Sequence, residues 1–304
     1  MSSITKLVLM SVVAVPLAGQ AHAADVTAQK AVLVTGASTG IGRAIAERLA
    51  ADGYFVYAGA RKDADLKALG AIKNVRGVRL DVTNSQDIDA AVETITKAGR
   101  GLYGLVNNAG VVTLGSVAET KWDEFDLVMS VNVYGPYRMT KAFEPLIIAS
   151  KGRITTIGSV SGILAGRDFS AYSMSKHAIE AFTDSLAQEM APLGVQVSVI
   201  EPGSYASEAV KSFAKRTGFE LADGSKEKQP DEVADAVEQA LFAVSPKRRY
   251  MVVPDERAAN APIRKQIEQL VQLNEGQPYT YDREALIKML DEALAQARPR
   301  ANFR

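Results

Sequence analysis

The chain has 304 residues, of which 47% are hydrophobic and 23% are charged, and its formal net charge is zero. This composition fits one large globular domain, and the balanced charge does not indicate a nucleic-acid partner. The absence of cysteine excludes thiol catalysis, disulfides and zinc sites with cysteine ligands, and only two histidines, His22 and His177, are present, so we expect no metal site.

The first 23 residues have the order of a secretory signal peptide. Lys6 supplies a positive charge, Leu7 to Leu17 form an apolar run of eleven residues, and Ala21-His22-Ala23 fits a cleavage site. The run is too short to cross a bilayer comfortably, so we expect no stable membrane span. Cleavage after Ala23 predicts a periplasmic or secreted protein. The alternative is a misassigned start, which predicts a cytoplasmic one.

From Lys30 to about Val253, short β-branched runs alternate with longer amphipathic stretches. The alternation predicts βαβ units, and therefore an α/β fold of the Rossmann type, with a doubly wound parallel sheet of about seven strands. The predicted strands are 31–35, 54–58, 78–80, 102–106, 153–157, 195–200 and 250–253. The main predicted helices are 41–51, 124–148 and 172–193.

Three glycines directly follow the first predicted strand, in Thr35-Gly-Ala-Ser-Thr-Gly-Ile-Gly42. Small residues at a strand-to-helix turn let the backbone approach a pyrophosphate, and the helix N-terminus favours the anion. A glycine cluster can be a simple turn, but this one lies between a predicted strand and a predicted helix, which indicates a dinucleotide site. The expected cofactor contacts on this turn are Gly36, Ser38, Thr39, Gly40, Ile41 and Gly42.

The second predicted strand ends in Ala58-Gly-Ala-Arg-Lys62, without an acid where one would bind a ribose 2′-hydroxyl. Arg61 can instead pair with a 2′-phosphate, so the sequence favours NADP, with NAD still possible. The alternative is a solvated basic loop. Asp63 and Asp65 come slightly too late to bind the ribose and are expected to cap the next helix.

Tyr172 and Lys176 are four residues apart in a predicted helix, and Ser159 precedes the tyrosine by thirteen residues. The four-residue spacing places both side chains on one helix face. A tyrosine with a pKa of about 10 is a poor base at neutral pH, and a neighbouring ammonium would lower that pKa. Together the three residues can move a proton onto or off a carbonyl oxygen. A Tyr-x-x-x-Lys pair alone is weak evidence, because helix surfaces often carry it.

The C-terminal third contains two further predicted features. The polar stretch from Arg216 to Pro230 predicts a loop, and the segment from Ser204 to Gln229 follows the sixth strand, where a substrate lid is expected. Two helices, roughly 261–273 and 282–297, predict an appendage packed on the sheet domain. The predicted organisation is therefore a signal peptide (1–23), an NAD(P)-binding catalytic domain (24–254) and a helical extension of it (255–304).

With these features in order, the chain resembles the short-chain dehydrogenase/reductase family over roughly residues 30–253. Within that family it looks most like the retinol and 17β-hydroxysteroid dehydrogenase branch. Six motifs carry the family resemblance: the glycine turn, Asp81-Val82, Asn107-Asn-Ala-Gly110, Asn132, the Ser159/Tyr172/Lys176 set and Pro202-Gly203. Three segments carry the branch resemblance: Ile200-Glu-Pro-Gly203, Ala58-Gly-Ala-Arg61 and Lys247-Arg-Arg-Tyr-Met251.

The resemblance implies that Tyr172 is the general acid or base, Ser159 orients the substrate oxygen, Lys176 binds the nicotinamide ribose and Asn132 holds a proton-relay water. The activity implied is NADP(H)-dependent interconversion of a carbonyl and an alcohol by hydride transfer. The substrate would be a small-molecule carbonyl or alcohol, and lipophilic compounds are included. The enzyme would be a homo-oligomer. Further implied cofactor contacts are Asp81, Val82, Asn108, Ala109, Gly110, Tyr172, Lys176, Pro202 and Gly203.

Three departures from the family pattern stand out. Thr155-Thr-Ile-Gly158 replaces the usual Asn-Ile-Ser before Ser159, which we expect to change only packing. Tyr205 is bulky between Pro202-Gly203 and Ser207, where a threonine commonly contacts the carboxamide. A signal peptide conflicts with the supply of NADP. Two alternatives stay open: a cofactor-binding sensor or scaffold without turnover, and an extended-type epimerase. The intact relay set argues against the first, and the glycine spacing against the second.

Overall fold

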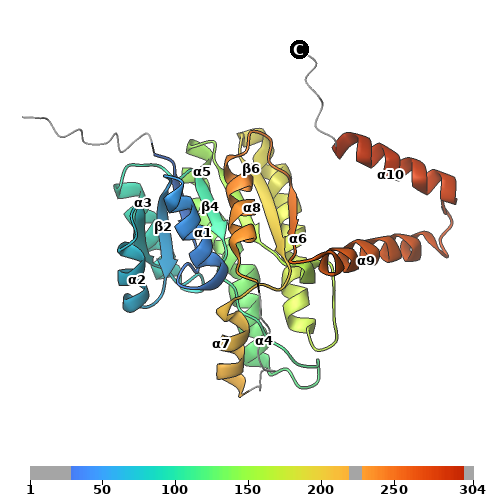
Figure 1. The fold of residues 1–304 in the computed structure, drawn as a ribbon, viewed down its shortest axis with the longest axis horizontal. Coiled ribbons are helices and arrows are strands. Elements are labelled where there is room, and N and C mark those ends of the chain that lie inside the picture. Colours follow the sequence, from blue (N-terminus) through green and yellow to red (C-terminus); the bar gives the residue numbers. More distant parts are fainter. Residues whose placement is uncertain (1–28, 219–227, 298–304) are drawn as a thin grey trace, which may run out of the picture.

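The structure, a computed structural model, describes residues 29–218 and 228–297, so the predicted signal segment lies outside the described residues. Its centre is a seven-stranded parallel sheet with the order β3-β2-β1-β4-β5-β6-β7 (Figure 1). The predicted doubly wound sheet is therefore confirmed. The strands are β1 (Ala31–Val34), β2 (Phe55–Ala60), β3 (Val75–Arg79), β4 (Gly104–Asn107), β5 (Arg153–Ile157), β6 (Gln196–Pro202) and β7 (Arg249–Val252).

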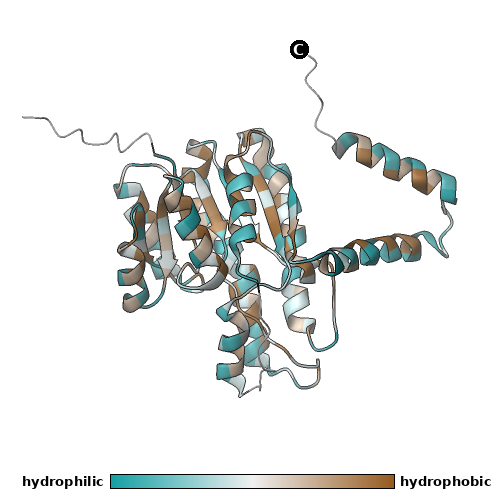
Figure 2. Cartoon of the chain, in the orientation of Figure 1, coloured by the Kyte–Doolittle hydropathy of each residue, from teal (hydrophilic) through white to brown (hydrophobic). Residues whose placement is uncertain are grey.

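Helices cover both faces of the sheet, which explains why the strands read as continuous apolar runs. One hydrophobic core lies between the sheet and α1 (Gly40–Ala51), α2 (Asp63–Gly70) and α8 (Asp231–Phe242). The other lies between the sheet and α3 (Ser85–Lys97), α5 (Gly135–Ala149) and α6 (Ser170–Met190). Figure 2 shows hydrophobic residues concentrated on the strands and on the inward faces of these helices.

The strand order reverses direction between β1 and β4. Leu33 of β1 pairs with Tyr57 of β2 on one side and with Leu105 of β4 on the other. In open parallel sheets the crevice beyond the carboxyl ends of the strands at such a switch point binds ligands. The loops after β1 and β4, which carry the glycine turn and Asn107 to Gly110, both leave the sheet at this edge.

The single helix predicted over 124–148 is interrupted. It consists of α4 (Trp122–Met129), a π-helical turn (Ser130–Tyr134) and α5, with Pro136 in the first turn of α5. Asn132 lies inside the π-helical turn. Such one-turn interruptions displace backbone groups from the regular helical pattern and are frequent at functional sites. Hydrophobic spacing did not reveal the interruption, because the π-helical turn adds only five residues between α4 and α5.

The segment predicted as a lid contains a helix. Residues Glu208–Thr217 form α7, with Glu208 in its first turn and Lys215 and Arg216 in its last, an arrangement that complements the helix dipole. The helix ends at Gly218, whose φ of 76° suits a glycine. The loop predicted to start at Arg216 therefore begins too early. Residues 219–227 lie outside the described residues.

The C-terminal extension does not pack on the sheet domain, so this prediction is wrong. It consists of α9 (Glu256–Asn274) and α10 (Arg283–Ala297), which project from the domain as an arm (Figure 1). Asp255 and Asp282 cap the two helices, each accepting a backbone hydrogen bond at 2.8 Å. Within the described parts of α9 and α10, Pro262 is the one buried residue. Both helices were predictable from their spacing, but their lack of a partner within residues 29–218 and 228–297 was not.

Candidate active site

The glycine turn after β1 is held by backbone conformation and by Asn108. Gly36 and Gly40 have φ values of +63° and +55°, which side chains disfavour. A Cβ on Gly42 would lie 2.3 Å from the Asn108 amide nitrogen. That nitrogen donates to the carbonyls of Thr35 and Gly36, at 2.8 and 3.2 Å. The segment after β4 thus fixes the turn after β1.

The N-terminus of α1 fits the pyrophosphate of a dinucleotide. The capping residue, Thr39, makes no side-chain hydrogen bond to the first turn, and that turn contains no acid. The backbone N–H groups of this first turn are therefore bonded neither by the Thr39 side chain nor by an acid within the turn. The helix dipole favours an anion there. Ser38, Thr39 and Ile41 lie on the same turn as Gly40, which carries no Cβ to obstruct the approach.

Arg61 and Asp81 lie together at the carboxyl ends of β2 and β3. Arg61 is 69% exposed, and its Nη1 lies 3.6 Å from Asp81 Oδ2. Burial acts to raise the pKa of Asp81, but hydrogen bonds from Thr83 and the Arg61 charge outweigh it and lower the pKa. Asp81 stays ionised and orients Arg61 at the position where a ribose phosphate is expected.

The expectation that Asp63 and Asp65 cap α2 is wrong. The capping position belongs to Lys62, which forms no side-chain cap, and both acids lie within the first helical turn. There they complement the helix dipole, and Asp63 also pairs with Arg79 of β3.

The structure brings Ser159, Tyr172 and Lys176 together from two elements, the end of β5 and the start of α6. Lys176 is buried, and its ammonium donates to the Ile157 carbonyl at 2.9 Å and lies 5.6 Å from the centre of the Tyr172 ring. The Ser159 hydroxyl accepts from the Ser161 amide at 3.0 Å. The three predicted side chains therefore share one small volume.

Burial dominates the protonation of the tyrosine and the lysine. It raises the pKa of Tyr172, while the hydrogen bond with Ser159 acts in the opposite direction. Burial lowers the pKa of Lys176 to about 8, with the charge of Glu180 opposing it. The predicted lowering of the tyrosine pKa by Lys176 is therefore not seen in the protein alone. A protonated Tyr172 at neutral pH can act as an acid.

Asn132 joins three parts of the site. Its side chain exchanges two hydrogen bonds with the Val111 backbone, both of 2.9 Å, and donates to Ser175 Oγ at 3.0 Å. Ser175 Oγ in turn donates to the Tyr172 carbonyl at 2.7 Å. Both amide protons of Asn132 are therefore used by the protein, and the side chain is fixed in one orientation.

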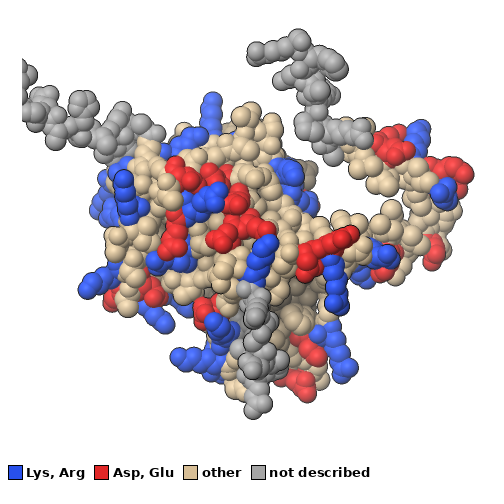
Figure 3. Space-filling view, in the orientation of Figure 1, with Lys and Arg blue, Asp and Glu red and all other residues tan. Residues whose placement is uncertain are grey.

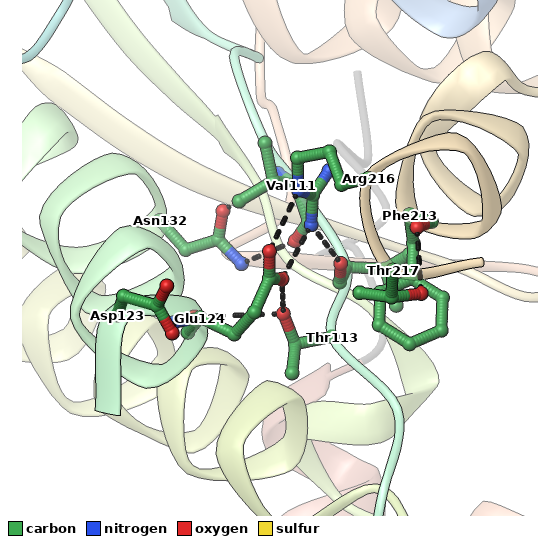
Figure 4. Close-up of polar contacts among 9 residues, drawn as sticks. Val111, Thr113, Asp123, Glu124, Asn132, Phe213, Arg216 and Thr217 are labelled. Atoms are coloured by element: carbon green, nitrogen blue, oxygen red, sulfur yellow. Dashed lines mark hydrogen bonds and ion pairs between the residues drawn. The ribbon is translucent and has the colours of Figure 1, made fainter. Parts of the chain in front are cut away.

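Helix α7 is fastened over the same region by Arg216 (Figure 4). The Arg216 guanidinium donates to both carboxylate oxygens of Glu124 on α4, at 3.0 and 2.8 Å, and to the Val112 carbonyl at 3.0 Å. Thr113 donates to the same carboxylate at 2.9 Å. These bonds, led by that from Arg216, outweigh burial and lower the pKa of Glu124. Segment 111–113 thus connects Asn132 to the predicted lid.

In the segment after β6, the Tyr205 side chain points away from the cofactor turn. Tyr205 is buried, and its hydroxyl donates to Glu232 at 2.7 Å. The bulky Tyr205 side chain is therefore directed toward α8. Ser207 lies against the glycine turn, with its Cα 3.4 Å from where a Cβ of Gly40 would be.

The remaining predicted contacts lie around the same edge of the sheet. Val82 is buried, and a Cβ on Gly135 would lie 2.9 Å from its side chain. Ala109 packs against Gly36, and a Cβ on Gly110 would lie 3.6 Å from Asn132 Oδ1. The amide of Gly203 donates to the Val252 carbonyl at 2.8 Å.

Sequence reasoning missed a charged cluster next to Lys176. Glu180 lies one turn after Lys176 on α6, and Glu201 directly precedes Pro202 on β6. Arg249 of β7 lies 3.3 Å from a Glu180 oxygen and 3.6 Å from a Glu201 oxygen. A signal was present: Glu201 is the one acid in the otherwise uncharged strand β6.

This cluster also explains why Gly158 precedes Ser159. A Cβ at Gly158 would lie 2.9 Å from Val199 and 3.0 Å from Glu180 Oε1. Burial, together with the neighbouring Glu180, raises the pKa of Glu201 to about 7, against the charge of Arg249. The pair therefore favours one shared proton near neutral pH.

The described residues include no group of three or more histidines and acids able to hold a metal ion. In residues 29–218 and 228–297, no helix is long and apolar enough to cross a membrane.

Comparison with known proteins identifies the family. A model of the short chain dehydrogenase family matches residues 30–218. The chain belongs to the short-chain dehydrogenase/reductase family. It is 36% identical to a mitochondrial D-beta-hydroxybutyrate dehydrogenase of Mus musculus, over 76% of this chain and 78% of that one. It is 39% identical to retinol dehydrogenase 5 of Mus musculus, over 57% and 56%. The retinol dehydrogenase-like branch is therefore supported.

A solved structure agrees with the fold and with the cofactor class. A metagenomic short-chain oxidoreductase in complex with NADP superposes with a TM-score of 0.62 and 30% identity, covering 74% of this chain and 97% of that one. Members of the short-chain dehydrogenase/reductase family to which the chain belongs act as dehydrogenases on CH–OH groups with NAD(P). The predicted reaction class is confirmed at this level.

Proposed function

We propose that the protein is an NADP(H)-dependent oxidoreductase that interconverts a carbonyl and an alcohol, with Tyr172 as the proton donor in reduction. The convergence of Ser159, Tyr172 and Lys176 beside the glycine turn carries this proposal, because proton transfer and cofactor binding then share one volume. The bound nicotinamide supplies or accepts the hydride.

Tyr172 and Ser159 handle the substrate oxygen. Burial keeps the Tyr172 hydroxyl protonated at neutral pH, so it can donate to a carbonyl oxygen as that oxygen gains charge. Ser159 is fixed by its bond with the Ser161 amide and can donate to the same oxygen. Two donors aimed at one oxygen stabilise the developing negative charge. These roles favour reduction near neutral pH.

Lys176 and Asn132 would resupply the proton. With a pKa of about 8, Lys176 is mostly protonated at neutral pH, and its ammonium lies 5.6 Å from the centre of the Tyr172 ring. The amide protons of Asn132 are already bonded to Val111 and Ser175. A relay water would therefore be held by an oxygen acceptor, either Asn132 Oδ1 or a carbonyl displaced by the π-helical turn.

We propose that NADP is preferred over NAD. Arg61 is exposed directly after β2, which itself contains no acid, and Asp81 lies 3.6 Å from the guanidinium. A charge-assisted contact with a 2′-phosphate would then distinguish the two cofactors.

The substrate is proposed to be a small carbonyl or alcohol, with lipophilic compounds included. The named activities of its relatives cover a short hydroxy acid and retinol. The test is a screen of purified protein for NADPH oxidation with hydroxy-acid-derived ketones, aldehydes and retinal, and for NADP reduction with the matching alcohols. Turnover in either direction supports the proposal. Tight NADPH binding with no turnover across the panel would favour the sensor or scaffold instead.

We also propose export with cleavage after Ala23, which rests on the order of charge, apolar run and cleavage site in the sequence. N-terminal sequencing of protein from fractionated cells tests it. A mature end at Ala24 outside the cytoplasm supports export, whereas an intact end at Met1 or Ser2 in the cytoplasm rejects it.

A further inference from the structure

Both helices of the C-terminal arm leave an apolar stripe uncovered. Each stripe consists of three large aliphatic residues that are 40–58% exposed: Ile263, Ile267 and Leu270 on α9, and Ile287, Leu290 and Leu294 on α10. Figure 2 shows hydrophobic residues between polar ones along the two helices of the arm. Contiguous apolar surface of this kind marks an interaction site.

The spacing within the stripes is that of helices that pack on other helices. Ile263, Ile267 and Leu270 are separated by four and then three residues, and Ile287, Leu290 and Leu294 by three and then four. This heptad spacing keeps the side chains on one seam facing a partner helix. In proteins, most of the stability of such amphipathic helices comes from packing the apolar face on a partner.

The arm does not cover its own stripes. At its tip, the Asn274 side chain bonds both the amide and the carbonyl of Tyr281, each at 2.9 Å, which fixes the connection between the helices. In this arrangement α10 runs back beside α9 without closing on it (Figure 1), and Ile267 and Leu290 remain 56% and 58% exposed.

The two stripes nevertheless complement each other. If α9 and α10 are aligned antiparallel with Ile267 opposite Leu290, Ile263 meets Leu294 and Leu270 meets Ile287. Two flanking pairs also match in that register. Arg264 comes beside Asp291 on one side of the seam, and Leu273 comes beside Leu286 on the other.

The charge on the arm argues against a membrane as the partner. The helix α9 carries three basic and two acidic residues, and α10 carries two basic and three acidic, so the sum is zero. Figure 3 shows both signs on the arm. A helix that lies on a membrane is typically rich in Lys and Arg on its polar face.

We propose that the arm is a dimerisation device, in which α9 and α10 of one chain pack between α10 and α9 of a second copy as a four-helix bundle. The open arm offers each stripe to the complementary stripe of the partner, and two-fold symmetry then satisfies all four helices. The bundle lies away from the catalytic residues, so it would join two independent sites.

Cross-linking in the full chain tests the proposal, because the wild-type sequence contains no cysteine. Two variants, Ile267→Cys and Leu290→Cys, are purified separately, mixed and oxidised. We expect a covalent dimer containing one chain of each kind. The matched control is Lys265→Cys mixed with Glu292→Cys, which lie at the same level of the bundle on its outer face and should give little cross-link.

Two results would overturn the proposal. One is equal cross-linking by the inner and outer pairs. The other is a double variant, Ile267→Cys with Leu290→Cys, that cross-links only within one chain, because this would show that the arm closes on itself. Thermal unfolding under reducing conditions checks that each variant is folded.

Charge reversal gives a second measurement that needs no cysteine. Arg264→Glu and Asp291→Arg should each raise the dissociation constant of the dimer by roughly three- to tenfold, and the double variant should restore it. Analytical ultracentrifugation reads the constant. Singles without effect, or binding of the full chain to phosphatidylglycerol vesicles through the arm, would overturn the assignment.

Discussion

The catalytic edge of the sheet and the C-terminal arm use similar helices in opposite ways. Helix α6 buries nine of its residues and carries Tyr172 and Lys176, whereas α9 buries Pro262 and no other residue. At the catalytic edge, each side chain is fixed by contacts from several strands and helices. In the arm, both amphipathic faces are formed but have no partner within the described chain.

The difference shows what one chain can specify alone. The catalytic geometry needs small residues where backbones approach closely, and these residues leave recognisable motifs such as the glycine turn. The arm needs a complementary surface on a partner, and its sequence shows only the spacing of the apolar residues that would contact that partner. The following predictions separate the two regions, because changes at the catalytic edge should affect chemistry or folding in ways that equivalent changes in the arm do not.

The largest effect is expected for Tyr172→Phe. It removes the proton donor while keeping the ring, so kcat should fall by roughly 10²–10⁴-fold with little change in cofactor affinity. Steady-state kinetics with the best substrate and NADPH titration measure both. The matched change in the arm, Tyr279→Phe, should leave kcat unchanged, and a near-native kcat for Tyr172→Phe would refute the assignment.

The buried pair Glu180–Glu201 should make stability depend on pH. The pKa of Glu201 is raised to about 7, so its stabilising contribution is present at acidic pH and is lost as the pH rises through about 7. This contribution is at most about 4 kcal/mol for a shift from the usual glutamate pKa. Glu201→Gln should therefore lose less stability than wild type between about pH 5 and 8.

Chemical denaturation at a series of pH values measures this difference. The control is Glu268→Gln, an exposed glutamate of the arm, which should reproduce the wild-type slope. Parallel slopes for wild type and Glu201→Gln would mean that the two carboxyl groups do not share a proton.

Arg61→Ala should reduce the preference for NADP over NAD. Losing a charge-assisted contact should cost about 1.5–3 kcal/mol with NADP and little with NAD. The ratio of the two kcat/KM values measures the change, with Lys62→Ala as the neighbouring control. An unchanged ratio would place phosphate recognition on another residue.

The smallest expected effect comes from glycine substitutions. Gly42→Ala places a methyl group against the Asn108 amide and should destabilise the protein by about 1–3 kcal/mol. A Cβ added at Gly70 would meet open space, so Gly70→Ala should be neutral or stabilise the protein by up to about 1 kcal/mol. Equal free energies of unfolding for the two variants would contradict the close approach at the turn.

Much of the fold was predictable because the strands are short and apolar between recognisable turns. Strand β5 (Arg153–Ile157) matches its prediction at both ends, since Gly152 and Gly158 mark its limits. The start of α6 was also close, because Tyr172 and Lys176 fix a helical face. Helix α7 was less predictable, since its last turn is as polar as the loop expected there.

The grouping of Ser159, Tyr172 and Lys176 was predictable, but the environment of these residues was not. The Glu180–Glu201–Arg249 cluster joins α6, β6 and β7, and contacts across three elements leave no local pattern. The π-helical turn at Asn132 and the fastening of α7 by Arg216 likewise depend on tertiary contacts. The direction of the Tyr172 pKa shift was missed because sequence spacing shows a neighbouring charge but not the degree of burial.

Isotope transfer tests the central claim most directly. NADPH labelled with deuterium on the hydride-donating carbon is incubated with the wild-type protein and its best carbonyl substrate, and the alcohol is examined by mass spectrometry. We predict one deuterium on the carbinol carbon, and formation of the labelled alcohol roughly 10²–10⁴-fold more slowly with Tyr172→Phe. Two results would contradict hydride transfer assisted by Tyr172. One is an alcohol without deuterium, whichever face of the nicotinamide ring carries the label. The other is equal transfer of the label by wild type and Tyr172→Phe.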